Sequence, residues 1–286
     1  MKIYIDEKLK KYVVPTELRD NSKFDGKIFT SGTRIPLPED TKFIRMFSAW
    51  ATKDGEEARI DLDLGALFIT KENKIERIAY YNQSEEFAVH SGDFTSCRAF
   101  NKEDGKITAE FIDIDIERAK ETMKYAVISN IIYGGVVETF SEFDAWSGVQ
   151  ILDKFRTEKT EYININYALT KMNLHGEYRS QIPFAIDFET NELVLIDKYS
   201  EDYQGANVDS IAGKMEEFKK QYFNALDYKE NMYRLLELYS KAKEYTLVTN
   251  KEDADIICSY DDCSLVEGQT MFNISNNLDE ILNLLK

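Results

Sequence analysis

The feature that most constrains this chain is a succession of short segments, between residues 41 and 200, in which apolar and polar side chains alternate. In the segment 106–116, Ile112 and Ile114 fall on one face of an extended chain and Asp113 falls on the other. Many short strands joined by polar turns predict a mainly β protein, an antiparallel β-sandwich, rather than alternating strands and helices. The predicted strands are 43–51, 59–70, 75–82, 87–90, 106–116, 125–137, 149–155, 161–169, 181–187 and 192–198.

After residue 207 the pattern becomes helical, whereas the sandwich region contains few helical segments, such as a short one predicted at 142–148. Between 208 and 243 apolar side chains recur in steps of three and four, as on the buried face of an amphipathic helix. We therefore expect a sandwich domain with an N-terminal extension at 1–204, and a C-terminal helical and small α/β extension at 205–286. The further elements expected there are strands at 245–249, 255–260 and 270–274 and a closing helix at 278–285.

The balance of charges restricts the partners of the chain. Its 286 residues include 36 Lys and Arg against 52 Asp and Glu, a formal net charge of −16 at pH 7. A field of that sign repels phosphate backbones, so no nucleic-acid partner is expected. It suits a cation or a basic protein surface, and we expect a protein partner.

The apolar segments and the cysteines indicate the compartment. The longest apolar-rich stretch, 125–137, is interrupted by Ser129, Asn130 and two glycines, and is too short to span a bilayer. The three cysteines, at 97, 258 and 263, show no spacing typical of a disulfide framework or a zinc knuckle. We therefore expect reduced thiols, no membrane insertion and a cytoplasmic protein.

A pair of aspartates, Asp61 and Asp63, stands at the start of an apolar strand. A period of two places both carboxylates on one face, where they repel unless they are solvated, protonated or neutralised by a cation. Hard cations such as calcium prefer oxygen ligands, so the pair is a workable half-site. The alternative is an exposed strand edge in an acidic protein.

A third aspartate, Asp93, follows Gly92 at the end of another predicted strand. Glycine permits a tight turn there, and a loop that folded back would bring Asp93 to Asp61 and Asp63. An Asx-type turn without an ion is the alternative. Asp113 and Asp115 form a second pair, which we interpret as a solvated face.

Other catalytic and cofactor motifs are missing from the sequence. The two histidines, His90 and His175, have no Cys or His at metal-ligand spacing, which argues against zinc. There is no nucleophile elbow, and Gly134-Gly135 lacks the Lys-Ser/Thr of a phosphate-binding loop. We interpret this glycine pair as a bulge or strand break.

Three blocks in order resemble the TerD-like family of tellurium-resistance and stress-response proteins: RIDLDLGALF at 59–68, YYN at 80–82 and VHSGD at 89–93. The aromatic segment 43–50 and the preceding RIPLP resemble a longer bacterial variant of that family, which elsewhere occurs with RING-like zinc modules. The resemblance covers roughly residues 30–200.

This resemblance implies a TerD-like sandwich of two antiparallel sheets with calcium held at one end by acidic loops. Asp61, Asp63 and Asp93 fall on acidic positions of the family and Asn82 on its Tyr-Asn position. The loop 94–106, which follows Asp93, offers Asp104 as a further candidate metal ligand. The loop departs from the family pattern, because most of its expected acids are missing and Arg98 adds a positive charge. A weakened or lost ion site would follow from that departure.

Three functions are consistent with these features. The first is a non-enzymatic binding or scaffold protein of a bacterial stress-response system with a calcium site. The second is a hydrolase that uses the same aspartates and a divalent ion. The third is an interaction subunit whose C-terminal extension docks a protein partner or a second copy of the chain, forming a homo-oligomer. We expect the first, with the third as a compatible extension.

Overall fold

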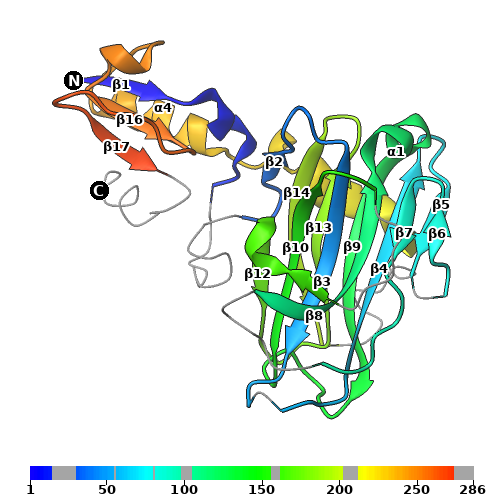
Figure 1. The fold of residues 1–286 in the computed structure, drawn as a ribbon. Coiled ribbons are helices and arrows are strands. Elements are labelled where there is room, and N and C mark those ends of the chain that lie inside the picture. Colours follow the sequence, from blue (N-terminus) through cyan, green and yellow to red (C-terminus); the bar gives the residue numbers. More distant parts are fainter. Residues whose placement is uncertain are drawn as a thin grey trace. The chain divides into compact units, whose positions relative to one another are not determined.

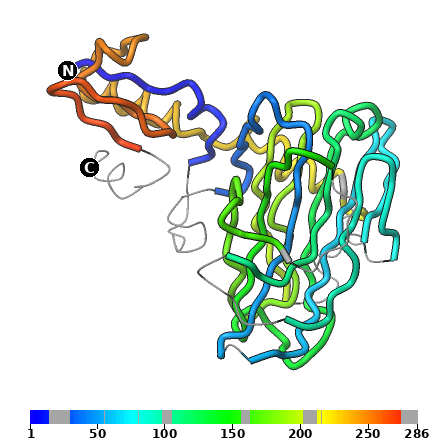
Figure 2. Tube along the Cα trace, viewed as in Figure 1, coloured from blue at the N-terminus to red at the C-terminus, as the bar shows by residue number. Residues whose placement is uncertain are grey.

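The computed structural model describes residues 1–14, 30–54, 56–79, 81–97, 105–155, 162–201 and 212–273 (Figures 1 and 2). The chain divides into two compact units. The larger unit comprises Pro36–Lys219, and the smaller combines Met1–Ile35 with Lys220–Lys286. No described helix is long and apolar enough to cross a membrane.

The first sheet of the larger unit has the strand order β12-β10-β3-β8-β7-β6, and β11 pairs with β8. Its central strands β10, β3 and β8 pair antiparallel over eight or nine residues each, as the alternating pattern predicts. The strands are β3 (Phe43–Ala51), β6 (Ser84–Glu85), β7 (Ala88–His90), β8 (Lys106–Asp115), β10 (Asp144–Leu152), β11 (Tyr162–Asn164) and β12 (Ala168–Leu174).

The second sheet has the order β2-β14-β13-β9-β4-β5 and faces the first (Figure 1). Strands β14, β13, β9, β4 and β5 pair antiparallel with their neighbours. The bounds are β2 (Arg34–Pro36), β4 (Ile60–Thr70), β5 (Ile75–Ile78), β9 (Met123–Gly135), β13 (Ser180–Asp187) and β14 (Glu192–Ser200). The expectation of a mainly β, antiparallel sandwich is therefore confirmed.

Aromatic packing and side-chain hydrogen bonds join the two sheets to each other. Phe68 of β4 packs edge-on against Phe87, with ring centroids 4.9 Å apart. Trp50 of β3 donates its indole N–H to the carbonyl of Ile60 at 3.0 Å. Phe68 and Trp50 are fully buried, and Phe87 is nearly so. The sandwich interior therefore lies between β3 and β4 and also beside β7.

The interpretation of Asp113 and Asp115 as a solvated face is wrong. Asp113 is fully buried, and Arg45 donates to its two carboxylate oxygens at 2.7 and 2.8 Å. Asp115 is largely buried and accepts the backbone N–H of Arg118, which caps helix α1 (Ile116–Thr122). The reason is a second apolar cluster over this face, formed by Phe47, Ala49, Ala51, Ile107, Ala109, Phe111, Ile163 and Ile165.

The prediction of a short helix at 142–148 is also wrong. Strand β10 begins at Asp144 and pairs with β3 on one side and β12 on the other. Residues that have a strand partner on both sides satisfy their main-chain groups in the sheet, which overrides a weak local helical preference. In the larger unit, the short helix α1 directly follows strand β8.

The smaller unit contains a parallel sheet with the order β15-β1-β16-β17. The strands expected at 245–249, 255–260 and 270–274 are all present, whereas the closing helix expected at 278–285 lies outside the described residues. The bounds are β1 (Lys2–Ile5), β15 (Thr246–Leu247), β16 (Ile256–Ser259) and β17 (Thr270–Asn273).

The helical pattern expected between 208 and 243 is present as several pieces. Within the described residues from 212 onward, only the last piece has the length of an ordinary helix, and its N-cap is the side chain of Asn231, which accepts the N–H of Arg234. The pieces are α3 (Met215–Phe218), the π-helical η4 (Lys219–Phe223), the 3₁₀ turn η5 (Ala225–Asp227) and α4 (Met232–Ala242). Further 3₁₀ turns are η1 (Glu7–Lys11), η3 (Ile165–Tyr167) and η6 (Lys251–Asp253).

The grouping of residues 1–35 with the C-terminal part differs from the expected division into 1–204 and 205–286, which placed them with the sandwich. Strand β1 lies between β15 and β16 in the parallel sheet. Ile3 and Ile5 are buried there, and the N–H of Asp6 continues the pairing by donating to the carbonyl of Cys258 at 2.9 Å. Local sequence pattern does not reveal which distant strand a terminal strand will join.

This grouping predicts how the chain can be divided. A fragment of residues 36–219 should be soluble and show one cooperative unfolding transition, because it contains every strand of the two antiparallel sheets except the edge strand β2. In a fragment of residues 1–219, β1 should lack slow hydrogen exchange, because the strands that flank it, β15 and β16, are missing. Circular dichroism and hydrogen exchange test this. An unfolded 36–219 fragment beside a folded full chain would contradict it.

Candidate metal centre

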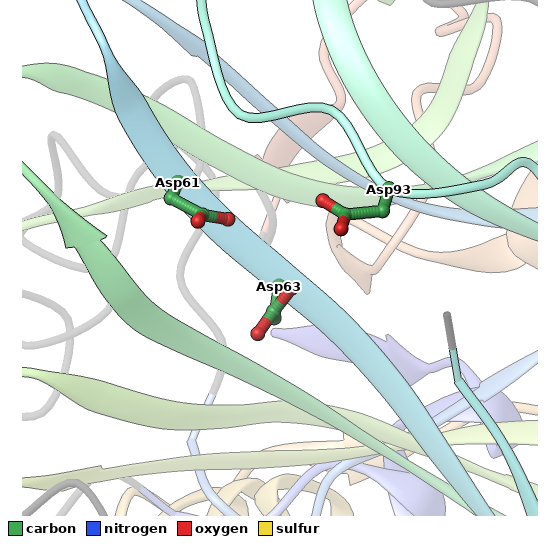
Figure 3. A group of neighbouring side chains, drawn as sticks. All are labelled: Asp61, Asp63 and Asp93. Carbon is green, nitrogen blue, oxygen red and sulfur yellow. The ribbon is translucent and has the colours of Figure 1, made fainter. Parts of the chain in front are cut away.

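Three carboxylates meet at the side of strand β4 (Figure 3). Asp61 and Asp63 lie on β4, and Asp93 lies in the segment that follows β7. One carboxylate oxygen of each residue lies within 4.8 Å of those of the other two. Asp61 is buried, Asp63 is half-buried and Asp93 is exposed. The structure therefore brings together the three aspartates that the sequence pattern singled out.

The local fold around Asp61 depends on the glycine pair in β9. Asp61 is opposite Gly134 and Leu62 is opposite Ile132, so Tyr133 is an extra residue in β9, a β-bulge. Gly135 has a φ of 112°, and a Cβ there would collide with the carbonyl oxygen of Arg59. The expectation of a bulge at the glycine pair is confirmed, and it accounts for the need for glycine beside the aspartate.

The segment that carries Asp93 is fixed against β8. Ser91 donates its N–H to the carbonyl of Phe111 at 2.8 Å, and its hydroxyl accepts the N–H of Phe111 at 3.0 Å. Gly92 has a φ of 113°, a region that other residues rarely adopt. The chain therefore turns at Gly92, and Asp93 follows directly beside β4.

Burial and the neighbouring carboxylate charges raise the pKa values of Asp61 and Asp63. Burial raises the pKa of Asp63 to about 7, with the charges of Asp61 and Asp93 adding to the effect. The pKa of Asp61 is raised by burial and by Asp93, against the opposing charge of Arg59. Repulsion of this kind is relieved by a proton or by a cation. The arrangement thus offers three oxygen ligands to a hard cation, which would complete its coordination with main-chain or water oxygens.

A fourth acid, Glu110 of β8, lies behind the group and was missed by the sequence reasoning. Its side chain is fully buried, and its two carboxylate oxygens accept the N–H groups of Leu64 at 2.8 Å and Phe94 at 3.0 Å. Burial raises its pKa well above the ordinary value, while these two hydrogen bonds oppose the rise. A signal was present, because alternation places Glu110 on the same face as Ile112 and Ile114.

His90 of β7 completes this polar layer. Its Nδ1 accepts the N–H of Gly92 at 3.0 Å, so the neutral ring carries its hydrogen on Nε2, which donates to the carbonyl of Leu64 at 2.9 Å. Nε2 also lies 3.7 Å from a carboxylate oxygen of Glu110. Both ring nitrogens of His90 therefore bind main-chain groups.

Two further residues were expected to be ligands. Asn82 is exposed in the turn after β5, and its side-chain amide donates to the carbonyl of Arg77 at 2.6 Å. Its role as a ligand stays a prediction. Asp104 lies outside the described residues, as does Arg98.

No protein-family model matches the sequence, and no curated protein matches it significantly. Among solved structures, the chain is similar to a protein of unknown function, SAV2460, with 10% identity and a TM-score of 0.39 over 61% of this chain and 96% of that one. It is also similar to SCO6318 from Streptomyces coelicolor A3(2), a homologue of the telluride resistance protein TerD. Here the identity is 9% and the TM-score 0.39 over 61% of this chain and 97% of that one. Likeness at this level concerns the fold and carries no information about a bound ion or an activity.

Proposed function

We propose that this chain is a non-enzymatic binding or scaffold protein of a bacterial stress-response system, of the tellurium-resistance type, and that it binds calcium through Asp61, Asp63 and Asp93. The observation that carries the ion-binding part is the approach of three carboxylates within 4.8 Å of one another. The stress-response part is supported by the resemblance of the three sequence blocks at 59–68, 80–82 and 89–93.

Calcium suits this group better than the other common metals. All three side chains offer carboxylate oxygens, the ligands of hard cations, whereas zinc favours nitrogen and sulfur. The two aspartates on β4 and the one in the segment after β7 form an open arrangement, which fits the flexible geometry of calcium better than the strict octahedron of magnesium. Because only three acids converge, the affinity should fall in the range of weak sites, about 10⁻⁴–10⁻³ M.

The partner we propose is a protein with a basic surface, met in the cytoplasm. The net charge of −16 supports a basic surface, because opposite charge steers association and the same charge repels nucleic acid. An assembly role for the C-terminal extension, with a partner or a second copy, is a compatible part of this proposal.

One observation favours a metal-dependent hydrolase as the second candidate. The pKa of Asp63, about 7, suits a general base at neutral pH. Against this, both ring nitrogens of His90 bind main-chain groups, so His90 does not supply the base of a nucleophile–histidine pair. Turnover of nitrophenyl esters or phosphates in the presence of a divalent ion, lost in Asp63→Asn, would favour the hydrolase.

The experiment for calcium binding is equilibrium dialysis of the EDTA-treated full chain against radioactive calcium. We expect saturable binding of one ion below about 1 mM and at least a tenfold loss of affinity in Asp93→Ala, because a ligand oxygen is removed. Asp144→Ala removes an exposed acid at the start of β10 and should leave the affinity unchanged. Equal binding by both variants, or none by the natural chain, would contradict the ion-binding proposal.

A further inference from the structure

The buried side chain of Glu110 links the two parts of the chain that carry the aspartates. Its Oε2 accepts the N–H of Leu64, which directly follows Asp63 in β4. Its Oε1 accepts the N–H of Phe94, which directly follows Asp93. One rigid side chain from β8 therefore holds both main chains next to their aspartates.

Leu64 needs such a partner because its own sheet leaves one side open. Strand β9 pairs along the whole of β4, but β5 pairs only from Ala66 to Ile69. The N–H and C=O of Leu64 are satisfied instead by the side chains of Glu110 and His90. Two side chains of the first sheet thus take the place of a neighbouring strand at the point where the aspartates lie.

Asp93 is held on both sides by the same layer. The N–H of Gly92, just before it, donates to Nδ1 of His90, and the N–H of Phe94, just after it, donates to Glu110. Three residues further on, Cys97 exchanges main-chain hydrogen bonds with Ala58, close before β4. Without the bond to Glu110, the segment between Gly92 and Cys97 would lose its link to β4.

We propose that Glu110, assisted by His90, is the positioning residue of the three-aspartate site: it clamps the segment carrying Asp93 to β4 and thereby sets the spacing of the ligands. This inference rests on the proposed calcium site, but the clamp itself is a property of the ion-free chain. Glu110 does not need to touch the ion, because it acts through the main chain at Leu64 and Phe94.

The test compares Glu110→Gln with Asp113→Asn in the full-length chain. The glutamine keeps the shape of the side chain, but its amide nitrogen faces an N–H donor, so only one of the two bonds survives. Asp113→Asn is the matched control, because it makes the same chemical change on the same strand, at a buried residue on the opposite face. Should this control not fold, Ser147→Ala removes a buried hydrogen bond to the carbonyl of Phe47 instead.

The first readout is the calcium dissociation constant from dialysis. We expect a weakening of tenfold or more in Glu110→Gln and no change in the control, although the control loses more thermal stability. A control that loses affinity as much as Glu110→Gln, or a Glu110→Gln variant with unchanged affinity, would overturn the inference. If the natural chain binds no calcium, the proposed ion site fails and the second readout decides the inference.

The second readout needs no metal. Cys97 is buried beside Ala58, and its alkylation by iodoacetamide in EDTA, followed by peptide mass mapping, reports how often the segment leaves β4. Glu110→Gln should accelerate this labelling at least fivefold over the natural chain and over the control. Equal labelling rates would overturn the clamp whether or not calcium binds.

Discussion

Replacing Asp113 by alanine should lower the free energy of unfolding by about 3–5 kcal/mol, because it leaves the guanidinium of Arg45 buried without its counter-charge. Asp113 is fully buried and Arg45 is 2% exposed, and the two side chains form a two-pronged ion pair between β3 and β8. The guanidinium also lies 3.5 Å from the ring centroid of Phe111, so it has no route to water on that side. Urea unfolding followed by circular dichroism measures the loss.

A double variant separates the ion pair from the packing around it. Arg45→Met with Asp113→Leu removes both charges and keeps apolar volume, so it should recover most of the stability lost in Asp113→Ala. Glu189→Ala, which breaks an ion pair with partly exposed groups to Lys124, should cost less than about 1 kcal/mol. A loss below about 1 kcal/mol for Asp113→Ala would mean that Arg45 finds water or another acceptor.

The second large effect is a dependence of stability on pH in the ion-free chain. The pKa of Asp63 is about 7 in the folded state, against an ordinary value of 3.8. Between these values the folded state holds the proton and the unfolded state does not. The free energy of unfolding therefore falls as the pH rises from about 4 to about 7, and it levels off above that range.

Asp63→Asn should remove most of this slope, because an amide does not ionise. In EDTA at pH 8 the variant should be more stable than the natural chain by about 1–2 kcal/mol, after allowance for solvent screening of the half-buried group. At pH 4 the two proteins should be nearly equal. Denaturant unfolding at several pH values, with Asp144→Asn as the control, measures this. The predicted direction would be contradicted if the free energy of unfolding of the natural chain were higher at pH 8 than at pH 5 and Asp63→Asn abolished that difference.

Much of the sandwich was predictable because its strands follow a period of two. β3, β4 and β8 were expected within a residue or two of their bounds, since apolar side chains on one face of a strand must be buried. What the period does not show is whether the other face is covered as well. Asp113 was therefore assigned to solvent, although the face it occupies is covered by a second apolar cluster.

The candidate metal site could also be predicted only as far as local sequence signals reach. The approach of Asp61, Asp63 and Asp93 was anticipated from an alternating strand and a glycine turn, both of which are local signals. Glu110 was missed because its partners are main-chain groups of Leu64 and Phe94, 46 and 16 residues away in the sequence. The available signal was a single acid on the same strand face as Ile112 and Ile114, since a buried acid needs partners that satisfy both of its oxygens.

The measurement that tests the central claim most directly is thermal unfolding of the full chain in EDTA and in about 1 mM calcium. A ligand that binds only the folded state stabilises it by about 2.7 kcal/mol at a concentration 100 times its dissociation constant, and by less at a weak site. We predict a rise of the transition temperature of at least about 2 °C that is lost in Asp61→Ala and Asp93→Ala. An unchanged transition in calcium would contradict the claim that these aspartates form a working ion site.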